Sequence, residues 1–378
     1  MSRRALFGIS LSAFIVMLGM GIITPLLPIF AQDLGASGIW IGVIFSAYSF
    51  SRLVFLPISG MLSDRYGRRR TILLGLFLYS SVTFLYILSK TPEQLSFVRM
   101  LHGITSAMII PVAMASVGDI SIKGKEGFFI GKFNQSLFLG MASGPIVGGV
   151  LNDILGMKLT FMSLSFFGFF TLLVVFISFP ETVTTRKEKK PVFRNSKLWI
   201  AFIFRFINSM GRGSILSFLP IYLGFLNYST TVIGSLVSLN LFISALIQPS
   251  FGRLSDRVGV RYPVIMSALA GAGILFALPR VSSLDSLIFL SVLLGITSAM
   301  SIPAVGAIVA VEGKKGGMGQ LMGILSASKS LGRVVGPVVS GVIFDVFGGG
   351  IYGVRMAFTL ASLLSVSSAI IFWIGYKD

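Results

Sequence analysis

Cysteine is absent from this chain of 378 residues, histidine occurs once, and acidic residues are scarce, with 13 Asp and Glu against 31 Lys and Arg. Without cysteine, the chain has no disulfides, thiolate metal sites or cysteine nucleophiles. One histidine without a nearby cysteine cannot form a metal site, so we expect neither a metal nor a cofactor. Charged residues of both signs make up only 12% of the chain, about half the share found in a soluble domain.

Long apolar runs take the place of the missing charge. Hydrophobic residues make up 54% of the chain, which also has 34 Phe and 43 Gly, and the mean hydropathy is +0.91. A helix needs about 20 apolar residues to cross a bilayer, and the runs are continuous rather than alternating, which disfavours strands. The sequence therefore predicts an all-α membrane protein of twelve transmembrane helices, at residues 6–30, 38–60, 71–89, 94–117, 128–151, 158–180, 197–222, 229–251, 262–280, 286–310, 320–343 and 355–376.

The chain has a net charge of +18, and most of its basic residues lie between these apolar runs. Their distribution predicts the orientation of the chain. If the N-terminus is cytoplasmic, the outer loops hold only Lys90, Lys158, Arg280 and Arg355, and the inner segments hold the other loop cations. We therefore expect a multi-pass protein of the plasma or inner membrane with both termini in the cytoplasm. The basic charge then serves topology, and no nucleic-acid partner is predicted.

The second half of the chain repeats the first. Equivalent segments are always 192 positions apart: residues 60–67 match 252–259, residues 103–108 match 295–300, and residues 140–145 match 332–337. An even number of spans separates the copies, so the two halves are parallel and related by a pseudo-two-fold axis along the membrane normal. We predict two pseudo-symmetric six-helix bundles, at residues 1–180 and 198–378, which are joined by a cytoplasmic linker at 181–197 and enclose a substrate path.

Four motifs in the chain resemble those of one transporter family. They are Gly60-x-Leu-Ser-Asp-Arg-x-Gly-Arg-Arg69, Arg99-x-x-His102-Gly103, Gly140-x-x-x-Gly-Pro-x-x-Gly-Gly149, and Leu18-Gly19 with Pro25-Leu-Leu-Pro28. Together they resemble the major facilitator superfamily, and most of all its twelve-helix multidrug:proton antiporters. The resemblance covers the whole chain and implies a secondary transporter that works by alternating access.

The first motif is expected to form a cytoplasmic gate. Asp64 can pair with Arg68 one turn away, and Asp119 is a candidate third member of the network. The resemblance implies a latch that holds the cytoplasmic side closed, whereas a solvated loop that only sets topology is the alternative. The second copy has Val260 in place of Arg68. The predicted gate residues are Gly60, Asp64, Arg65, Gly67, Arg68, Asp119, Asp256 and Arg257.

Glycines spaced by four form a smooth stripe in each half, which lets another helix approach closely. A proline within each stripe frees part of the backbone. Two interpretations stay open, a seal and hinge between the halves or ordinary helix packing. The residues are Gly140, Gly144, Pro145 and Gly148, with Gly332, Gly336 and Pro337 in the second copy.

Cationic side chains occur within the spans, and no carboxylate accompanies them there. Such groups mark functional positions by default. One interpretation is a cavity that attracts an anionic solute, and the other is arginines that reach the interfaces or anchor neighbouring helices. The candidate cavity residues are Arg52, Arg99, His102, Asn134, Gln135, Arg205, Asn208, Arg212, Asn240, Lys329 and Arg333.

Proton coupling has three candidate carriers, His102, Asp33 and Asp64. Histidine has an unperturbed pKa of about 6.5, which suits a proton switch. The alternative for His102 is a hydrogen-bonded packing residue.

Other classes of function find little support. Gly124-Lys125-Glu126 lacks the upstream glycine and the hydroxyl residue of a phosphate loop, and neither a His-Glu-x-x-His nor a Gly-x-Ser-x-Gly motif is present. We therefore predict that the protein is not an enzyme but a proton-coupled exporter of small amphipathic organic compounds, acting as a monomer. A porter for organic anions is the main alternative, and a transporter-like sensor or a membrane enzyme is a remote one.

Overall fold

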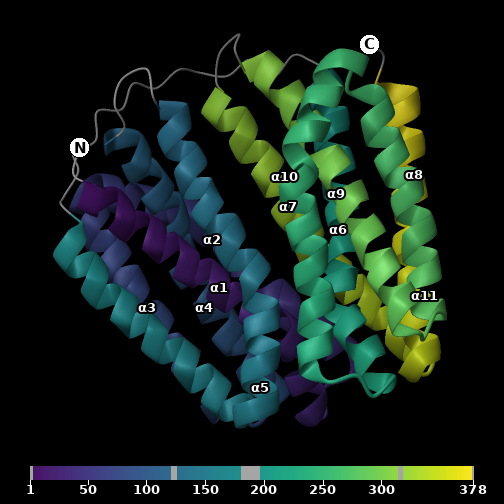
Figure 1. Cartoon of the computed structure of the whole chain (residues 1–378), viewed down its shortest axis with the longest axis horizontal. Helices are drawn as coiled ribbons and strands as arrows, with labels where there is room; N and C mark the ends of the chain where they lie inside the picture. The colour runs from purple at the N-terminus through teal and green to yellow at the C-terminus, as the bar shows by residue number, and fades with distance from the viewer. Residues whose placement is uncertain (1–2, 121–125, 180–195, 314–317, 377–378) are drawn as a thin grey trace. The chain divides into compact units, whose positions relative to one another are not determined.

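The computed structural model describes residues 3–120, 126–179, 196–313 and 318–376, and within these ranges the chain folds into α-helices with one short 3₁₀ turn and no strand (Figure 1). Most of the predicted linker, residues 181–195, lies outside the described residues. The helices are α1 (Arg3–Asp33), α2 (Gly38–Tyr66), α3 (Arg68–Leu88), α4 (Pro92–Ile120), α5 (Glu126–Ser178), α6 (Ser196–Phe225), α7 (Thr230–Val258), α8 (Arg261–Ala277), α9 (Leu284–Gly313), α10 (Met318–Val346) and α11 (Gly350–Gly375).

Helix α5 contains two of the predicted spans. Its 53 residues are interrupted at Gly156, where the backbone is non-helical, with a φ of 78° and a ψ of 169°. A positive φ of this size is readily adopted only by glycine. With α5 divided there, the described residues contain the twelve predicted helical segments, and the expected all-α membrane fold is confirmed.

The composition of most helices is that of membrane spans. Within the described residues, nine helices are long and apolar enough to cross a bilayer. Helices α6 and α10 are not among them, and these are the helices that carry Arg205, Arg212, Lys329 and Arg333. Large apolar side chains such as Phe166 and Ile177 are exposed, as expected where lipid replaces water around a helix.

The helices are grouped into two compact units. Unit 1 consists of residues 1–36, 47–186 and 229–235, and unit 2 consists of residues 37–46, 187–228 and 236–378. Compared with the predicted halves, two short segments are exchanged, namely the start of α2 and the start of α7. Each of these two helices therefore begins in one unit and continues in the other.

Unit 1 is built around α5. Figure 1 shows α1, α3 and α5 side by side, and α5 packs against both of the others. Its core includes Ile72, Leu76, Ile109 and Phe133, all fully buried. Serine and threonine hydroxyls within these helices bond to the carbonyl one turn back, as Thr83 does to Tyr79 at 2.8 Å, which satisfies the hydroxyl away from water.

Unit 2 repeats this arrangement. Helix α6 packs against α10 and α11, and α8 packs against α9 and α11. The core of unit 2 includes Phe204, Val264, Ala304 and Phe372. Each unit is thus a bundle of mainly apolar helices within which polar side chains are held.

Candidate functional site

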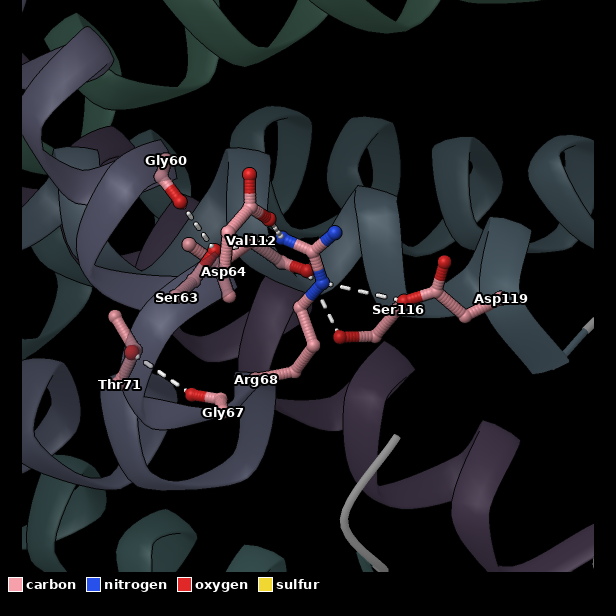
Figure 2. Close-up of polar contacts among 9 residues, drawn as sticks. All are labelled: Gly60, Ser63, Asp64, Gly67, Arg68, Thr71, Val112, Ser116 and Asp119. Carbon is pink, nitrogen blue, oxygen red and sulfur yellow. Dashed lines mark hydrogen bonds and ion pairs between the residues drawn. The ribbon is translucent and has the colours of Figure 1, made fainter. Parts of the chain in front are cut away.

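Arg68 is the centre of a charged network at the junction of α2 and α3 (Figure 2). Its Nη1 lies 2.8 Å from Oδ1 of Asp64, and its Nε lies 3.1 Å from Oδ2 of Asp119 on α4. Nη1 also donates a hydrogen bond of 2.6 Å to the hydroxyl of Ser63. The predicted pairing of these three charged residues is confirmed, and their role as a gate stays a prediction.

Local geometry holds the guanidinium in place. Gly67 separates α2 from α3 with a φ of 99°, a conformation that favours glycine. Its carbonyl accepts a hydrogen bond of 2.9 Å from the hydroxyl of Thr71, which closes the first turn of α3. The side chain of Arg68 is only 8% exposed, so its two carboxylates compensate a charge that is largely removed from water.

The second copy of this motif differs. Val260 takes the place of Arg68 and packs on the apolar core of unit 2. Arg257 is exposed, and the side chain of Asp256 lies outside the described residues. In the first copy, Gly60 lies inside α2, where an added methyl would meet no described atom within 4 Å, so none of the described helices approaches it closely. The ion network around Arg68 therefore has no counterpart among the described residues of the second repeat.

The next residue in each copy is an arginine with a shared role that the sequence analysis missed. Arg69 donates to the carbonyl of Phe176 at 2.6 Å and lies 5.1 Å from the centre of its ring. Arg261, 192 positions later, donates to the carbonyl of Trp373 at 2.9 Å and lies 4.4 Å from its ring. Both cations satisfy carbonyls near the C-terminal end of a helix, where positive charge is favourable.

The glycine stripe of the first repeat packs against α1. A methyl added at Gly144 would lie 2.5 Å from the carbonyl oxygen of Leu18 and 2.6 Å from Cα of Gly21. One added at Gly148 would lie 2.9 Å from Cα of Ile22, and one at Gly140 would overlap the carbonyl of Phe14. The two backbones are therefore in direct contact, as the glycine spacing predicted.

The second stripe behaves in the same way. Methyls added at Gly332 and Gly336 would overlap the carbonyls of Phe206 and Met210 on α6. In both repeats the partner helix belongs to the same repeat as the stripe. These glycines therefore join helices within one repeat, whereas the carbonyls of Pro145 and Pro337 lie against Gly234 on α7 and Gly42 on α2, so both interpretations stay open.

Arg99 and His102 lie inside unit 1 in a cluster of tyrosines. The hydroxyl of Tyr86 is 3.0 Å from Nδ1 of His102 and 3.5 Å from Nη1 of Arg99, so the two residues share a face of α4 as predicted. The guanidinium of Arg99 lies 4.6 Å from the centre of the Tyr48 ring, a cation–π contact. The ring of Tyr79 packs 4.5 Å from that of His102.

This cluster is shielded from solvent, because Arg99 is 2% exposed and His102 is 1% exposed. Sequence reasoning missed its three tyrosines. Tyr79 and Tyr86 are seven residues apart on α3, a spacing that places two side chains on one helix face. That spacing was the available signal, whereas the contribution of Tyr48 from α2 depends on how the helices pack.

Four cationic residues lie on neighbouring helices of unit 2. Helix α6 carries Arg205 and Arg212, and α10 carries Lys329 and Arg333. All four are half-buried, and the hydroxyl of Ser209 joins the helices by donating to the carbonyl of Lys329 at 2.7 Å. The guanidinium groups of Arg205, Arg212 and Arg333 are close enough to interact electrostatically.

This cationic cluster has no acidic residue near it on its own helices. Helix α6 contains no Asp or Glu, and α10 contains only Asp345, one residue before its end. Like charges repel strongly where water is scarce. The three guanidinium groups would attract an anion, so an anionic ligand is a candidate for this cluster.

The remaining predicted site residues do not form one group. Asn240 on α7 donates to the carbonyl of Ser291 at 3.4 Å. Gln135 is exposed, whereas Asn134, Asn208 and Arg52 are half-buried. Arg65 is exposed beside the ring of Tyr66, and Asp33 is exposed at the end of α1.

The chain is similar to known transporters along its whole length. The profile of the Major Facilitator Superfamily matches residues 9–205 and 201–378. An uncharacterized transporter of that superfamily from Methanocaldococcus jannaschii is 29% identical over 360 residues, or 92% of each chain. Multidrug resistance protein 1 of Bacillus subtilis is 27% identical over 348 residues, or 88% of each chain.

A solved structure supports the fold. A bacterial homologue of the human lysosomal transporter Spinster, in an inward-facing and unoccupied conformation, superposes with a TM-score of 0.85 at 15% identity, covering 98% of this chain and 96% of that one. Because the superfamily profile matches both repeats, the chain belongs to the major facilitator superfamily and is a multi-pass membrane transporter, not an enzyme.

Proposed function

We propose that this protein exports small amphipathic organic compounds by alternating access, and that an inward flow of protons drives the export. The similarity to a multidrug resistance protein over 88% of both chains carries this proposal. The Arg68 network gives it a physical basis, because an ion network at a helix junction can break and re-form as a transporter changes state.

Transport by the purified protein in proteoliposomes tests both parts of the proposal. We expect a lipophilic cationic dye such as ethidium to move when a pH gradient is imposed, and to stop moving when an ionophore collapses the gradient. Equal rates with and without the gradient would remove proton coupling. If neither ethidium nor neutral amphipathic dyes move, small amphipathic organic compounds are not the substrates.

Three variants then test the proton carriers, His102→Gln, Asp33→Asn and Asp64→Asn. His102 is the leading candidate because it is the only histidine and its ring bonds to a tyrosine hydroxyl in the interior of unit 1. Glutamine can keep a hydrogen bond to Tyr86 but cannot exchange a proton near neutral pH. If His102 carries the proton, its variant binds dye but no longer responds to the gradient, and an unchanged response excludes it.

A porter for organic anions is the second candidate, and the cationic cluster on α6 and α10 favours it. At the equivalent positions of the first repeat, 192 residues earlier, Met20 and Met141 stand in place of Arg212 and Arg333. The variants Arg212→Met and Arg333→Met therefore give unit 2 side chains that the same helix positions already carry in the other repeat.

Uptake or release of an anionic dye such as carboxyfluorescein by these variants tests the anion proposal. We expect each substitution to lower transport of the anion at least tenfold, as loss of a charged hydrogen-bonding partner does. Lys158→Met removes one positive charge from an exposed position on α5 and is the matched control. Equal losses in the control and the arginine variants would contradict a specific anion site.

We also propose that the protein resides in the plasma or inner membrane with both termini in the cytoplasm. The natural absence of cysteine allows a direct test. With a membrane-impermeant maleimide on intact cells, Ala36→Cys should react and Thr184→Cys should react only after the membrane is opened. The reverse pattern would invert the orientation.

A further inference from the structure

Two aspartates, one in each repeat, bind the first turn of a helix from the other repeat. Asp153 on α5 accepts hydrogen bonds from the backbone N–H of Thr230 at 3.2 Å and of Thr231 at 2.8 Å, where α7 begins. Asp345 on α10 accepts hydrogen bonds from the N–H of Gly38 at 2.7 Å and of Ile39 at 2.9 Å, where α2 begins. We call these contacts the Asp153 clasp and the Asp345 clasp.

The two clasps are equivalent under the duplication. Asp153 and Asp345 are 192 positions apart, and so are Gly38 and Thr230, and Ile39 and Thr231. The Asp153 clasp has one additional contact, because the hydroxyl of Thr230 donates to Oδ1 of the aspartate at 2.6 Å. A glycine takes that position in the Asp345 clasp, so the Asp153 clasp is the stronger of the two.

Close backbone packing continues along both helix pairs. A methyl at Gly149 would overlap the carbonyl of Thr230, and a methyl at Gly341 would overlap that of Gly38. One turn further, Gly42 of α2 is equally close to the carbonyl of Pro337. The clasps therefore lie at the start of two tight helix contacts, where the exchanged segments 37–46 and 229–235 sit.

A helix begins with N–H groups that have no partner within the helix and with the positive end of its dipole. A carboxylate that bonds two of these groups holds the helix end through both effects. A cap of this kind changes an equilibrium constant by about twofold to thirtyfold. When such a contact opens at an exposed position, water can satisfy the same groups, so the contact is reversible.

We propose that Asp153 and Asp345 are paired gating residues, and that transport requires both clasps to release. The inference rests on the proposed alternating access. The Asp345 clasp is at the start of α2, whereas Asp64 of the Arg68 network lies near the other end of α2, 26 residues from Gly38. In the proposed orientation the clasps therefore act at the outer face, opposite the Arg68 network.

Buried serines about two turns beyond the clasped helix ends can report the state of the clasps. Ser46 on α2, 6% exposed, donates to the carbonyl of Val334 on α10, and Ser238 on α7, 3% exposed, is its equivalent in the other repeat. Because the chain has no cysteine of its own, Ser46→Cys and Ser238→Cys can each be the single site for a water-soluble maleimide. Their labelling rates measure how often water reaches the helix contact.

The variants Asp153→Ala and Asp345→Ala each remove one clasp. If an alanine variant fails to fold, Asp153→Asn or Asp345→Asn takes its place and weakens the clasp instead. Either substitution should raise the labelling rate of both reporter cysteines severalfold, with a larger effect from Asp153. Asp285→Ala removes an exposed aspartate from the first turn of α9 and should leave both rates unchanged.

A gate and a local anchor give different results. If each clasp only anchors its own helix, a substitution accelerates labelling at the neighbouring reporter alone, and the proposal is overturned. Unchanged labelling at both reporters also overturns it. Labelling needs no substrate, so failure of ethidium transport would remove the proposed function without affecting this test.

Discussion

Replacing Gly144 by alanine tests whether the contact between α1 and α5 is as tight as the backbone positions indicate. The added methyl would lie 2.6 Å from Cα of Gly21 and 2.5 Å from the carbonyl of Leu18. Non-bonded carbon atoms are most favourably about 3.5–4.0 Å apart, so the two helices must separate by roughly 1 Å. Overpacking of this kind costs about 1–3 kcal/mol.

Gly273→Ala is the matched control, because a methyl at that position of α8 meets no described atom within 4 Å. Alanine is intrinsically favoured over glycine within a helix by about 1 kcal/mol. This intrinsic gain is common to both variants and cancels when they are compared. The free energy of unfolding of Gly144→Ala should therefore fall about 1–3 kcal/mol below that of Gly273→Ala.

Thermal unfolding of the detergent-purified variants, followed by tryptophan fluorescence, provides the measurement. Gly336→Ala, which places a methyl 2.7 Å from Cα of Met210, should lose a similar amount because it is the equivalent position. If Gly144→Ala unfolds at or above the temperature of Gly273→Ala, the helices adjust at no cost and the argument from close packing is refuted.

Three further outcomes follow from the site. Arg68→Lys should lower stability by about 1–3 kcal/mol in thermal unfolding, because an ammonium group cannot reproduce the fork that joins Asp64, Asp119 and Ser63; equal stability would mean that the network is dispensable. Tyr86→Phe should cost about 1–3 kcal/mol by leaving His102 without its partner, whereas Tyr262→Phe at an exposed position should cost nothing measurable. In a background where Trp40 and Trp199 are replaced by phenylalanine, Arg261→Gln should shift the fluorescence emission of Trp373, because the guanidinium lies 4.4 Å from the centre of that ring. An unchanged emission spectrum would contradict the contact.

Local spacing and duplication made much of the architecture predictable. Apolar runs of bilayer length gave the number of helical segments, and only the break at Gly156 separates two of them within α5. The four-residue spacing of Asp64 and Arg68 gave their pairing, since it places both side chains on one side of a helical turn. These features depend on residues near one another in sequence.

Contacts between distant segments were not predictable in the same way. Asp153 and Asp345 were recognisable as repeat equivalents, but their partners lie 77 and 307 positions away in sequence. The position of Tyr48 beside Arg99 depends on the rotation of α2 about its axis. Neither the period of the hydrophobic pattern nor a motif specifies such rotations, because several faces of a membrane helix are equally apolar.

Some residues differ in chemical character between equivalent positions of the two repeats. The need to hold the helices together does not explain these residues. Features that hold the helices of each repeat together occur twice, as the glycine stripes and the Arg69 and Arg261 contacts do. The ionisable residues inside the spans occur once: Arg205 is matched by Ala13, Lys329 by Leu137, and His102 by Leu294. Ala13 and Leu137 pack in or against the core of unit 1.

The same helix position can therefore be filled by an apolar residue in a stable bundle, so anchoring of the helix does not require the charge. A cation within a membrane span is costly and marks a functional position by default, so we propose that these residues serve a ligand or a proton. On this argument, exchanging Lys329 for leucine should preserve thermal stability and reduce transport, and a loss of stability would return the cationic cluster to a structural role.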